Sequence, residues 1–137
     1  QCLAFTTAAY PNFENQAGPA ADGVIREFWF VNGNPDNNAE AEAYLSSYKA
    51  AYGSDPQYPS PSAYDGMKLV AQALQDAGAD SDGYDKDAFV DAMSDINYTG
   101  VVGDISFAED GQLASAENIV FARSEGGELK IVSSLDE

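Results

Sequence analysis

An apolar stripe in the middle of the chain constrains the fold more than any other feature of the sequence. Apolar side chains recur there with the period of a helix, between Ser62, where a helix can begin, and Gly78, where it would end. The members of the stripe are Ala63, Met67, Val70, Leu74 and Ala77. Runs rich in β-branched and aromatic residues lie before and after this helix, so the chain must combine helices with strands.

Two further helices are predicted, one on each side of the central helix. The first covers residues 39–52, with Asn37 or Asn38 as its N-cap and Gly53 as its stop. Proline then excludes helix at three positions, Pro56, Pro59 and Pro61. The other helix covers about residues 85–93, with apolar side chains on one face and carboxylates near its N-terminus, where the helix dipole favours negative charge.

Strands are predicted towards both ends of the chain. Residues 2–5 form a short apolar run, and residues 24–31 form a β-branched and aromatic run that Asn32-Gly33-Asn34-Pro35 breaks. Beyond Gly100, an Asp110-Gly111 turn and a Gly126-Gly127 hairpin join the final strands. The order is two strands, three helices and a terminal strand cluster, which predicts an α/β fold.

The charge of the chain restricts its partners. Lys and Arg number 6 against 23 Asp and Glu, which gives a formal net charge of -17. Such a chain repels phosphates and anionic lipids, so nucleic acid is not an expected partner. Insertion of this segment into a membrane is not expected either, because no apolar run approaches the ~20 residues of a span. The shortage of basic partners for spread-out carboxylates is typical of proteins of salt-loving organisms.

Catalytic and metal-binding motifs are missing from the sequence. Histidine is absent, which excludes Ser-His-Asp triads and histidine metal sites, and the single Cys2 has no candidate base. The acidic residues 80–87 fail the spacing of a calcium-binding EF-hand loop, because position one would fall on Gly78. No glycine-rich nucleotide loop follows a strand. We therefore expect no enzyme activity, no cofactor and no metal. Asn97-Tyr98-Thr99 is a formal N-glycosylation sequon.

Four blocks of the sequence form an ordered pattern. The helix that opens with Ala63-Tyr64-Asp65-Gly66 and ends at Ala77-Gly78 is one such block. The others are Ala17-Gly18-Pro19-Ala20-Ala21-Asp22-Gly23-Val24, the run from Tyr48 to Pro56, and the run from Tyr98 to Phe107 with Asp110-Gly111. Together these blocks cover nearly the whole chain, and in this order they resemble the branched-chain amino acid (leucine, isoleucine and valine) type of solute-binding protein, which serves ABC transporters.

The resemblance implies part of a two-lobed type I periplasmic-binding-protein fold, with the chain threading between the lobes. It places residues 1–31 in lobe two, residues 32–115 with three helices in lobe one, and residues 116–137 back in lobe two. Because such proteins are considerably longer, it also implies a missing N-terminal part that completes the cleft. The chain begins at Gln1 without Met, which is typical of a processed or excised piece. An extracellular or periplasmic location, a membrane tether through the missing N-terminus and an ABC permease partner follow from the same resemblance.

The resemblance also indicates where a ligand would bind. An acidic residue of lobe two normally meets the ammonium group of the amino acid, but the matching position falls near Thr6 or Thr7. Hydroxyl groups there suit a ligand without a free ammonium, so an amide, a urea-like compound or a carboxylate stands beside a branched-chain amino acid as the solute. Tyr10 and Trp29 are further candidate ligand-binding residues, and both are also readable as core. A sensory or receptor domain of the same fold is the alternative function.

Overall fold

The computed structural model describes residues 2–4, 12–80, 82–114 and 119–132. Its helices are α1 (Asn12–Ala17), α2 (Ala39–Tyr52), α3 (Ser60–Asp76) and α4 (Lys86–Ser94), with a 3-10 helix, η2 (Gly18–Ala21), after α1. Its strands are β1 (Cys2–Ala4), β2 (Val24–Phe28), β3 (Asn97–Gly100), β4 (Gly103–Ser106), β5 (Val120–Glu125) and β6 (Glu128–Ile131). The predicted α/β class is confirmed.

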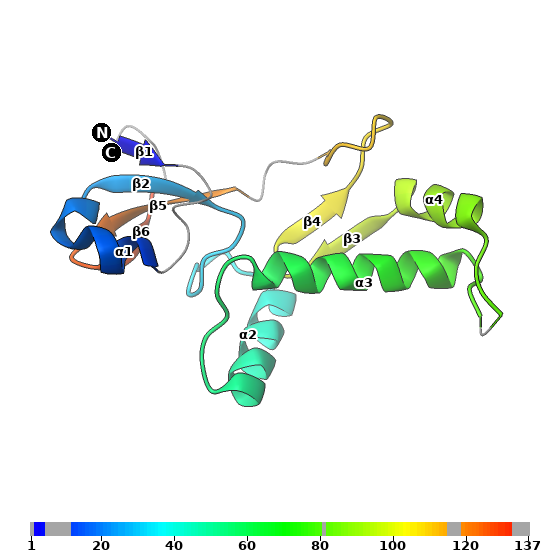
Figure 1. The fold of residues 1–137 in the computed structure, drawn as a ribbon, viewed down its shortest axis with the longest axis horizontal. Coiled ribbons are helices and arrows are strands. Elements are labelled where there is room, and N and C mark those ends of the chain that lie inside the picture. Colours follow the sequence, from blue (N-terminus) through cyan, green and yellow to red (C-terminus); the bar gives the residue numbers. More distant parts are fainter. Residues whose placement is uncertain (1, 5–11, 81, 115–118, 133–137) are drawn as a thin grey trace.

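A four-stranded sheet collects strands from both ends of the sequence. Its order is β1-β2-β5-β6, with β1 parallel to β2 and the other pairs antiparallel. Ile25 of β2 lies opposite Arg123 of β5, and Phe28 lies opposite Val120. Figure 1 shows this sheet and α1 as one part of the molecule, with the remaining helices beside it. The chain therefore leaves the sheet after β2 and returns to it at β5.

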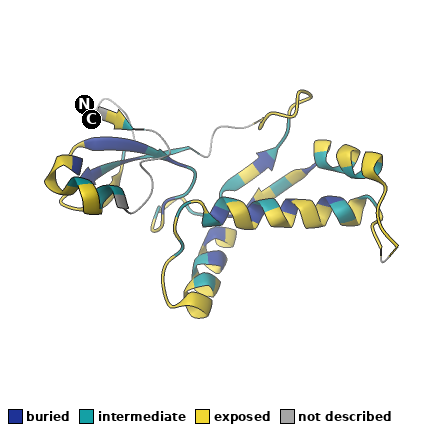
Figure 2. Cartoon of the chain, in the orientation of Figure 1, coloured by how far each residue is buried: buried dark blue, intermediate teal, exposed yellow. Residues whose placement is uncertain are grey.

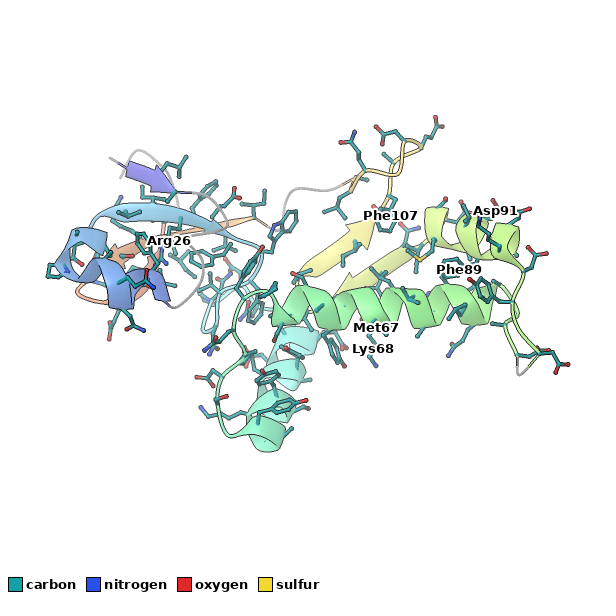
Figure 3. The ribbon with its side chains drawn as sticks, viewed as in Figure 1. Arg26, Met67, Lys68, Phe89, Asp91 and Phe107 are labelled. Carbon is teal, nitrogen blue, oxygen red and sulfur yellow. The ribbon has the colours of Figure 1, made fainter. Side chains whose placement is uncertain are left out.

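The helical part is built around α3. The antiparallel hairpin β3–β4 and helix α4 lie along one side of α3, and α2 crosses near its N-terminal end (Figure 1). Phe89 of α4 points towards α3 in Figure 3. The sequence predicted the apolar face of α4 correctly, because its partly buried side chains are Ala88, Phe89, Ala92 and Met93.

Capping residues set the ends of the helices. The Asn38 side chain accepts a hydrogen bond from the Ala41 amide, at 2.8 Å, and Gly53 ends α2 with a φ of 70°. Asp85 caps α4 in the same way. The prediction that proline excludes helix is wrong for Pro61, which lies in the first turn of α3. Proline is tolerated there because the first amides of a helix have no partner within the helix.

Three small hydrophobic clusters form the core of the part of the chain that the structure describes. Their buried members are Phe28, Val31 and Ala122 in the sheet; Ala41, Tyr44 and Val101 around α2; and Leu69, Ile96 and Ile105 between α3 and the hairpin. Two side chains join the sheet to the helical part. Tyr58, from the loop before α3, packs against the sheet cluster, and Phe30, just after β2, packs against the α2 cluster.

Helix α3 has apolar side chains on two faces. The buried side chains on the face towards the hairpin are Pro61, Asp65, Leu69 and Ala73. The stripe that the sequence predicted lies largely on the other face, where Met67 is 69% exposed and Val70 is 37% exposed. Figure 2 shows the exposed side of α3, and in Figure 3 Met67 and Lys68 project away from the hairpin. The second apolar face is thus open to solvent in this chain.

A buried arginine fastens α1 to the sheet. Arg26 of β2 is 1% exposed, forms an ion pair with Glu14 of α1, and donates to the Ser124 hydroxyl at 2.9 Å (Figure 3). Its guanidinium carbon lies 4.9 Å from the centroid of the Phe13 ring and 5.4 Å from that of Phe28. Both hydrogen bonding and ring packing therefore stabilise this buried cation.

Candidate functional site

The segment that leaves the sheet after β2 lies at the junction between the two parts of the molecule. Trp29 and Phe30 are half-buried, and Val31 is buried in the sheet cluster. Successive side chains of an extended segment point to opposite sides, so this segment faces more than one neighbour. Two hollows share Trp29 as a lining residue. The junction is therefore where a small molecule could be held between the sheet and the helices.

The first hollow, which we call the junction hollow, has a volume of about 340 Å³. It is lined by Trp29, Tyr58, Ser62, Gly66, Leu69, Val102, Ile105, Phe107 and Leu113. Most of these side chains are apolar, while Tyr58 and Ser62 carry hydroxyl groups. Phe107 lies where the chain leaves β4 (Figure 3). A mostly apolar hollow with a few polar groups is the usual form of a site for a small organic ligand.

A second hollow, which we call the back hollow, shares Trp29 and Val102 with the junction hollow. Its volume is about 430 Å³, and its polar lining comes from the loop between β2 and α2. The polar members are Asn34, Asp36, Asn37 and Asn38. Trp29 and Val102 thus contribute to the walls of both hollows, one side chain from the sheet side and one from the β3–β4 turn.

A larger hollow of about 720 Å³ continues from the junction hollow, because both contain Tyr58 and Ser62. Its lining includes Phe28 and Phe30 from the sheet side, together with the carboxylates Asp55 and Glu128. Tyr58 therefore lies where the two spaces meet. The junction consequently offers an apolar wall, hydroxyl groups and carboxylates within one region of the molecule.

The turn between β3 and β4 is held by a buried carboxylate of α3. Asp65 is 0% exposed, and its two oxygens accept hydrogen bonds from the amides of Val101, at 3.0 Å, and Val102, at 2.9 Å. Two charge-assisted bonds satisfy a group that would otherwise be costly to bury. Gly100, just before these valines, also accepts a hydrogen bond at its carbonyl oxygen from the Asn38 side chain, at 2.8 Å.

Two tyrosines close to this turn have perturbed ionisation. Burial raises the pKa of Tyr44 above the ordinary value of 10.0, although the hydrogen bond between its hydroxyl and the Ser60 hydroxyl, at 2.6 Å, opposes the shift. Burial also raises the pKa of Tyr98, and the negative charge of Asp65 adds to this effect. Both phenols therefore keep their protons to a higher pH than an exposed tyrosine does.

The acidic residues 80–87 serve the backbone of the turn before α4. Asp80 accepts a hydrogen bond from the Asp82 amide at 2.8 Å, and Asp85 accepts from the amides of Asp87 and Ala88. Within residues 2–4, 12–80, 82–114 and 119–132, no three Asp, Glu or Cys side chains converge in a way that could hold a metal ion. In the same ranges the helices are too short or too polar to cross a bilayer.

The structure places one of the four sequence-predicted site residues in the junction. Trp29 lines the junction hollow, whereas Thr6, Thr7 and Tyr10 lie outside the described residues. The sequence analysis missed Tyr58 and Ser62 as site residues, although the prolines around them indicated a loop rather than a continuous helix. Val102, which lies in the turn between β3 and β4, was not among the predicted site residues either.

Comparison with known proteins identifies the family. The sequence model of a family described as periplasmic binding protein matches residues 2–128, which is most of the chain. This chain belongs to the periplasmic binding protein family. The resemblance drawn from the sequence is thereby confirmed, and the family is one of binding proteins rather than enzymes. No curated protein sequence gave a significant match.

Solved structures of this family share the fold. The chain is similar to the leucine binding protein LivK from Thermotoga maritima, with a TM-score of 0.80 and 21% identity, over 96% of this chain and 36% of that one. LivJ from Streptococcus pneumoniae, in complex with isoleucine, has a TM-score of 0.76 and 24% identity, over 95% and 36%. An ABC transporter solute binding protein from R. palustris, in complex with benzoate, has a TM-score of 0.70 and 22% identity, over 87% and 31%. The chain thus spans about a third of the length of these periplasmic binding proteins.

Proposed function

We propose that this chain is the C-terminal part of an extracellular or periplasmic solute-binding protein that delivers a small solute to an ABC importer. The observation that carries the proposal is the junction hollow, a mostly apolar space between the sheet and the helical part. The family match supports the same function, which consists of binding and hinge closure without covalent chemistry.

The placement of the strands supports a division of the chain into two lobes. We assign residues 1–31 and 116–137 to lobe two and residues 32–115 to lobe one. In support, β1, β2, β5 and β6 form one sheet, while α2, α3, α4 and the β3–β4 hairpin lie beside it (Figure 1). Closure would then change the angle between the sheet and the helical part, with Trp29 and Phe30 in the connecting segment.

The exposed face of α3 supports a further partner, namely the N-terminal part of the same protein. Met67 and Val70 lie on this face together with Ala63, which is also exposed. Apolar surface left in water costs about 25 cal/mol per Å². The relatives described above are almost three times as long as the segment matched here, so we assign the cover of this face, and a tether to the membrane, to upstream sequence.

The lining of the junction hollow indicates the class of solute. An apolar wall with the hydroxyl groups of Tyr58 and Ser62 suits a solute that combines an aliphatic or aromatic group with a carboxylate or amide. A branched-chain amino acid, a small amide and an aromatic carboxylate meet this description. Urea, which has no apolar group, fits the wall less well. The isoleucine and benzoate bound by two structural relatives belong to the favoured class.

Thermal unfolding of the full-length protein tests the proposal. Isoleucine, leucine, benzoate, isovaleramide and urea are added separately, and a true ligand raises the melting temperature by an amount that grows with the logarithm of its concentration above Kd. At least one of the first four compounds should do so, and urea at the same millimolar concentration should not. If none of the four raises the melting temperature, solute capture by this protein is not the function.

A matched pair of variants places the binding in the junction hollow. Gly66 lies on α3 at the hollow, and a Cβ added there would meet no atom within 4 Å. Gly66→Leu should fill part of the hollow and weaken binding by about tenfold or more, which corresponds to about 1.4 kcal/mol. Ala43→Leu, at an exposed position of α2, should leave affinity unchanged. If the two variants bind the solute with equal affinity, the binding site does not lie in the junction hollow.

A further inference from the structure

The β3–β4 turn is held by side chains from two different helices. The buried Asp65 carboxylate, from α3, accepts hydrogen bonds from the amides of Val101 and Val102. From the start of α2, the Asn38 side chain donates to the carbonyl oxygen of Gly100. Val101 itself is buried in the cluster around α2. Both helices therefore fix the position of the β3–β4 turn. The turn then determines where Val102 lies.

Asn38 has two separable roles. Its Oδ1 atom accepts the Ala41 amide at 2.8 Å and so caps α2, while its Nδ2 atom donates to Gly100 at 2.8 Å. A serine at this position can still cap the helix through its hydroxyl oxygen, but it is too short to reproduce the second bond. The two roles can thus be tested independently.

Val102 links this network to the candidate site. It lines the junction hollow and the back hollow, as does Trp29. We propose that Asp65 and Asn38 are positioning residues for solute binding, which act by fixing Val102 and so setting the width of the junction hollow. The inference rests on the proposed function for the nature of the ligand, but the placement of Val102 relative to Trp29 can be measured without a ligand.

The experiment uses the full-length protein labelled with 5-fluorotryptophan. Trp29 is the single tryptophan of this chain, and Trp29→Phe assigns its ¹⁹F resonance among any others. Without ligand, Asn38→Ser and Asp65→Asn should each shift the Trp29 resonance, because the wall next to the indole moves. With isoleucine as the probe, both variants should bind about five- to tenfold more weakly, the factor expected for one lost hydrogen bond in the supporting network.

The control variant is Asp85→Ala, which removes the N-cap of α4 and lies outside the lining of both hollows. It lowers stability through the loss of the cap hydrogen bonds of α4, away from the β3–β4 turn, and should leave the Trp29 resonance and the isoleucine affinity unchanged. An equal effect from Asp85→Ala would mean that general loss of stability explains the result, which overturns the proposal.

The outcomes separate the two proposals. Unchanged resonances and affinities in both Asn38→Ser and Asp65→Asn, with isoleucine bound by the unmodified protein, overturn the positioning role alone. Shifted resonances in both variants, with no binding of isoleucine or of any favoured solute by the unmodified protein, support the placement of Val102 and overturn solute capture. If Asp65→Asn does not fold, Asn38→Ser alone decides, because it keeps the cap of α2.

Discussion

Gly100 lies so close to the Asp65 carboxyl group that a Cβ atom at this position would come within 2.5 Å of Asp65 Cγ. The same Cβ would also lie 2.5 Å from Cε1 of Tyr98. Asp65 cannot move aside freely, since two backbone amides hold it in a fully buried position. Close approach of the hairpin to α3 therefore requires glycine at this position.

Replacement of Gly100 by alanine should consequently destabilise the protein. Overpacking of this kind costs about 1–3 kcal/mol, and loss of one Asp65 hydrogen bond would add to that cost. Urea unfolding of the purified variant measures the change. A free energy of unfolding equal to that of the unmodified protein would contradict the close contact between Gly100 and Asp65.

Gly66 of helix α3 is the opposite case to Gly100 of strand β3. It lies within α3, and no atom lies within 4 Å of a Cβ added there. Gly66→Ala should raise the free energy of unfolding by about 0.5–1 kcal/mol, because glycine in a helix loses more conformational entropy than alanine. Denaturant titration beside Gly100→Ala provides the comparison. If Gly66→Ala and Gly100→Ala change the free energy of unfolding in the same direction, the difference in space between the two positions is contradicted.

Arg26 should not tolerate lysine. A lysine ammonium cannot bond Glu14 and Ser124 in the geometry of the guanidinium, nor pack flat against Phe13 and Phe28. We expect Arg26→Lys to lower the free energy of unfolding by about 2 kcal/mol or more, since it weakens a buried ion pair. Chemical denaturation followed by circular dichroism measures this change.

The control for this prediction is Arg123→Lys on the neighbouring strand β5. Arg123 is only partly buried and lies 3.8 Å from the Glu125 carboxylate. A partly exposed ion pair of this kind contributes about 0–1 kcal/mol, so this substitution should have a small effect. Similar losses in the two variants would show that burial of Arg26 is not what matters.

Alkaline pH should destabilise the protein through Tyr44, which is buried, and Tyr98, which is partly buried. The pKa values of Tyr44 and Tyr98 are raised in the folded state, chiefly by burial. As the pH rises through 10.0, the unfolded chain releases these protons while the folded chain still holds them. The contribution of the two protonated phenols to the free energy of unfolding should therefore be fully present below pH 10.0. It should be lost progressively as the pH rises from there towards the folded-state pKa values.

Urea titrations at a series of pH values measure this alkaline loss. A double Tyr44→Phe, Tyr98→Phe variant should show a shallower decline above pH 10.0, because phenylalanine has no proton to release. Tyr52→Phe is the control, since Tyr52 is 71% exposed and should leave the slope unchanged. If the free energy of unfolding declines with pH equally steeply in the double variant and in the unmodified protein, Tyr44 and Tyr98 are not the cause of the alkaline loss.

Salt should stabilise this chain more than it does a protein of balanced charge. With 23 acidic and six basic residues, most carboxylates face repulsion that dissolved cations screen, and the screening length falls from about 10 Å at 0.1 M to about 3 Å at 1 M salt. We expect the melting temperature to rise by several degrees between 0.1 M and 1 M potassium chloride, which calorimetry measures.

A charge variant tests whether screening is the cause. Asp76, Asp91 and Asp95 together line a hollow between α3 and α4, with Asp91 labelled in Figure 3. Replacing all three with asparagine should reduce the rise in melting temperature with salt. Sucrose at the same osmotic strength should not reproduce the effect of potassium chloride. An unchanged salt dependence in the triple variant would point to a cause other than repulsion.

Local signals in the sequence were sufficient to predict helices α2, α3 and α4, whereas the short helix α1 was not among the predicted helices. Helix α2 begins and ends where Asn38 and Gly53 indicated, because an N-cap side chain and a left-handed C-terminal glycine act within a few residues. The hairpin at Gly126-Gly127 is predictable for the same reason, since both glycines have positive φ values. Each of these signals needs no information from elsewhere in the chain.

The features that the sequence could not predict depend on contacts between distant residues. Val101 and Val102 form the β3–β4 turn although β-branched residues favour strands. The reason is that Asp65, which precedes them by 36 and 37 residues, accepts hydrogen bonds from their amides. Helix α3 shows a related limit. Its apolar stripe through Met67 was visible in the sequence, but periodicity alone cannot show which of two apolar faces packs against the hairpin.

The pairing of β2 with β5 has a consequence for synthesis on the ribosome. Ile25 cannot meet Arg123 until the chain beyond residue 120 has emerged, whereas the helices and the β3–β4 hairpin are complete well before that point. Contacts between residues close in sequence form fast, and contacts between distant residues form late. The sheet is thus assembled last, and until β5 emerges strand β2 keeps an unpaired edge, which is a template for unwanted pairing with another chain.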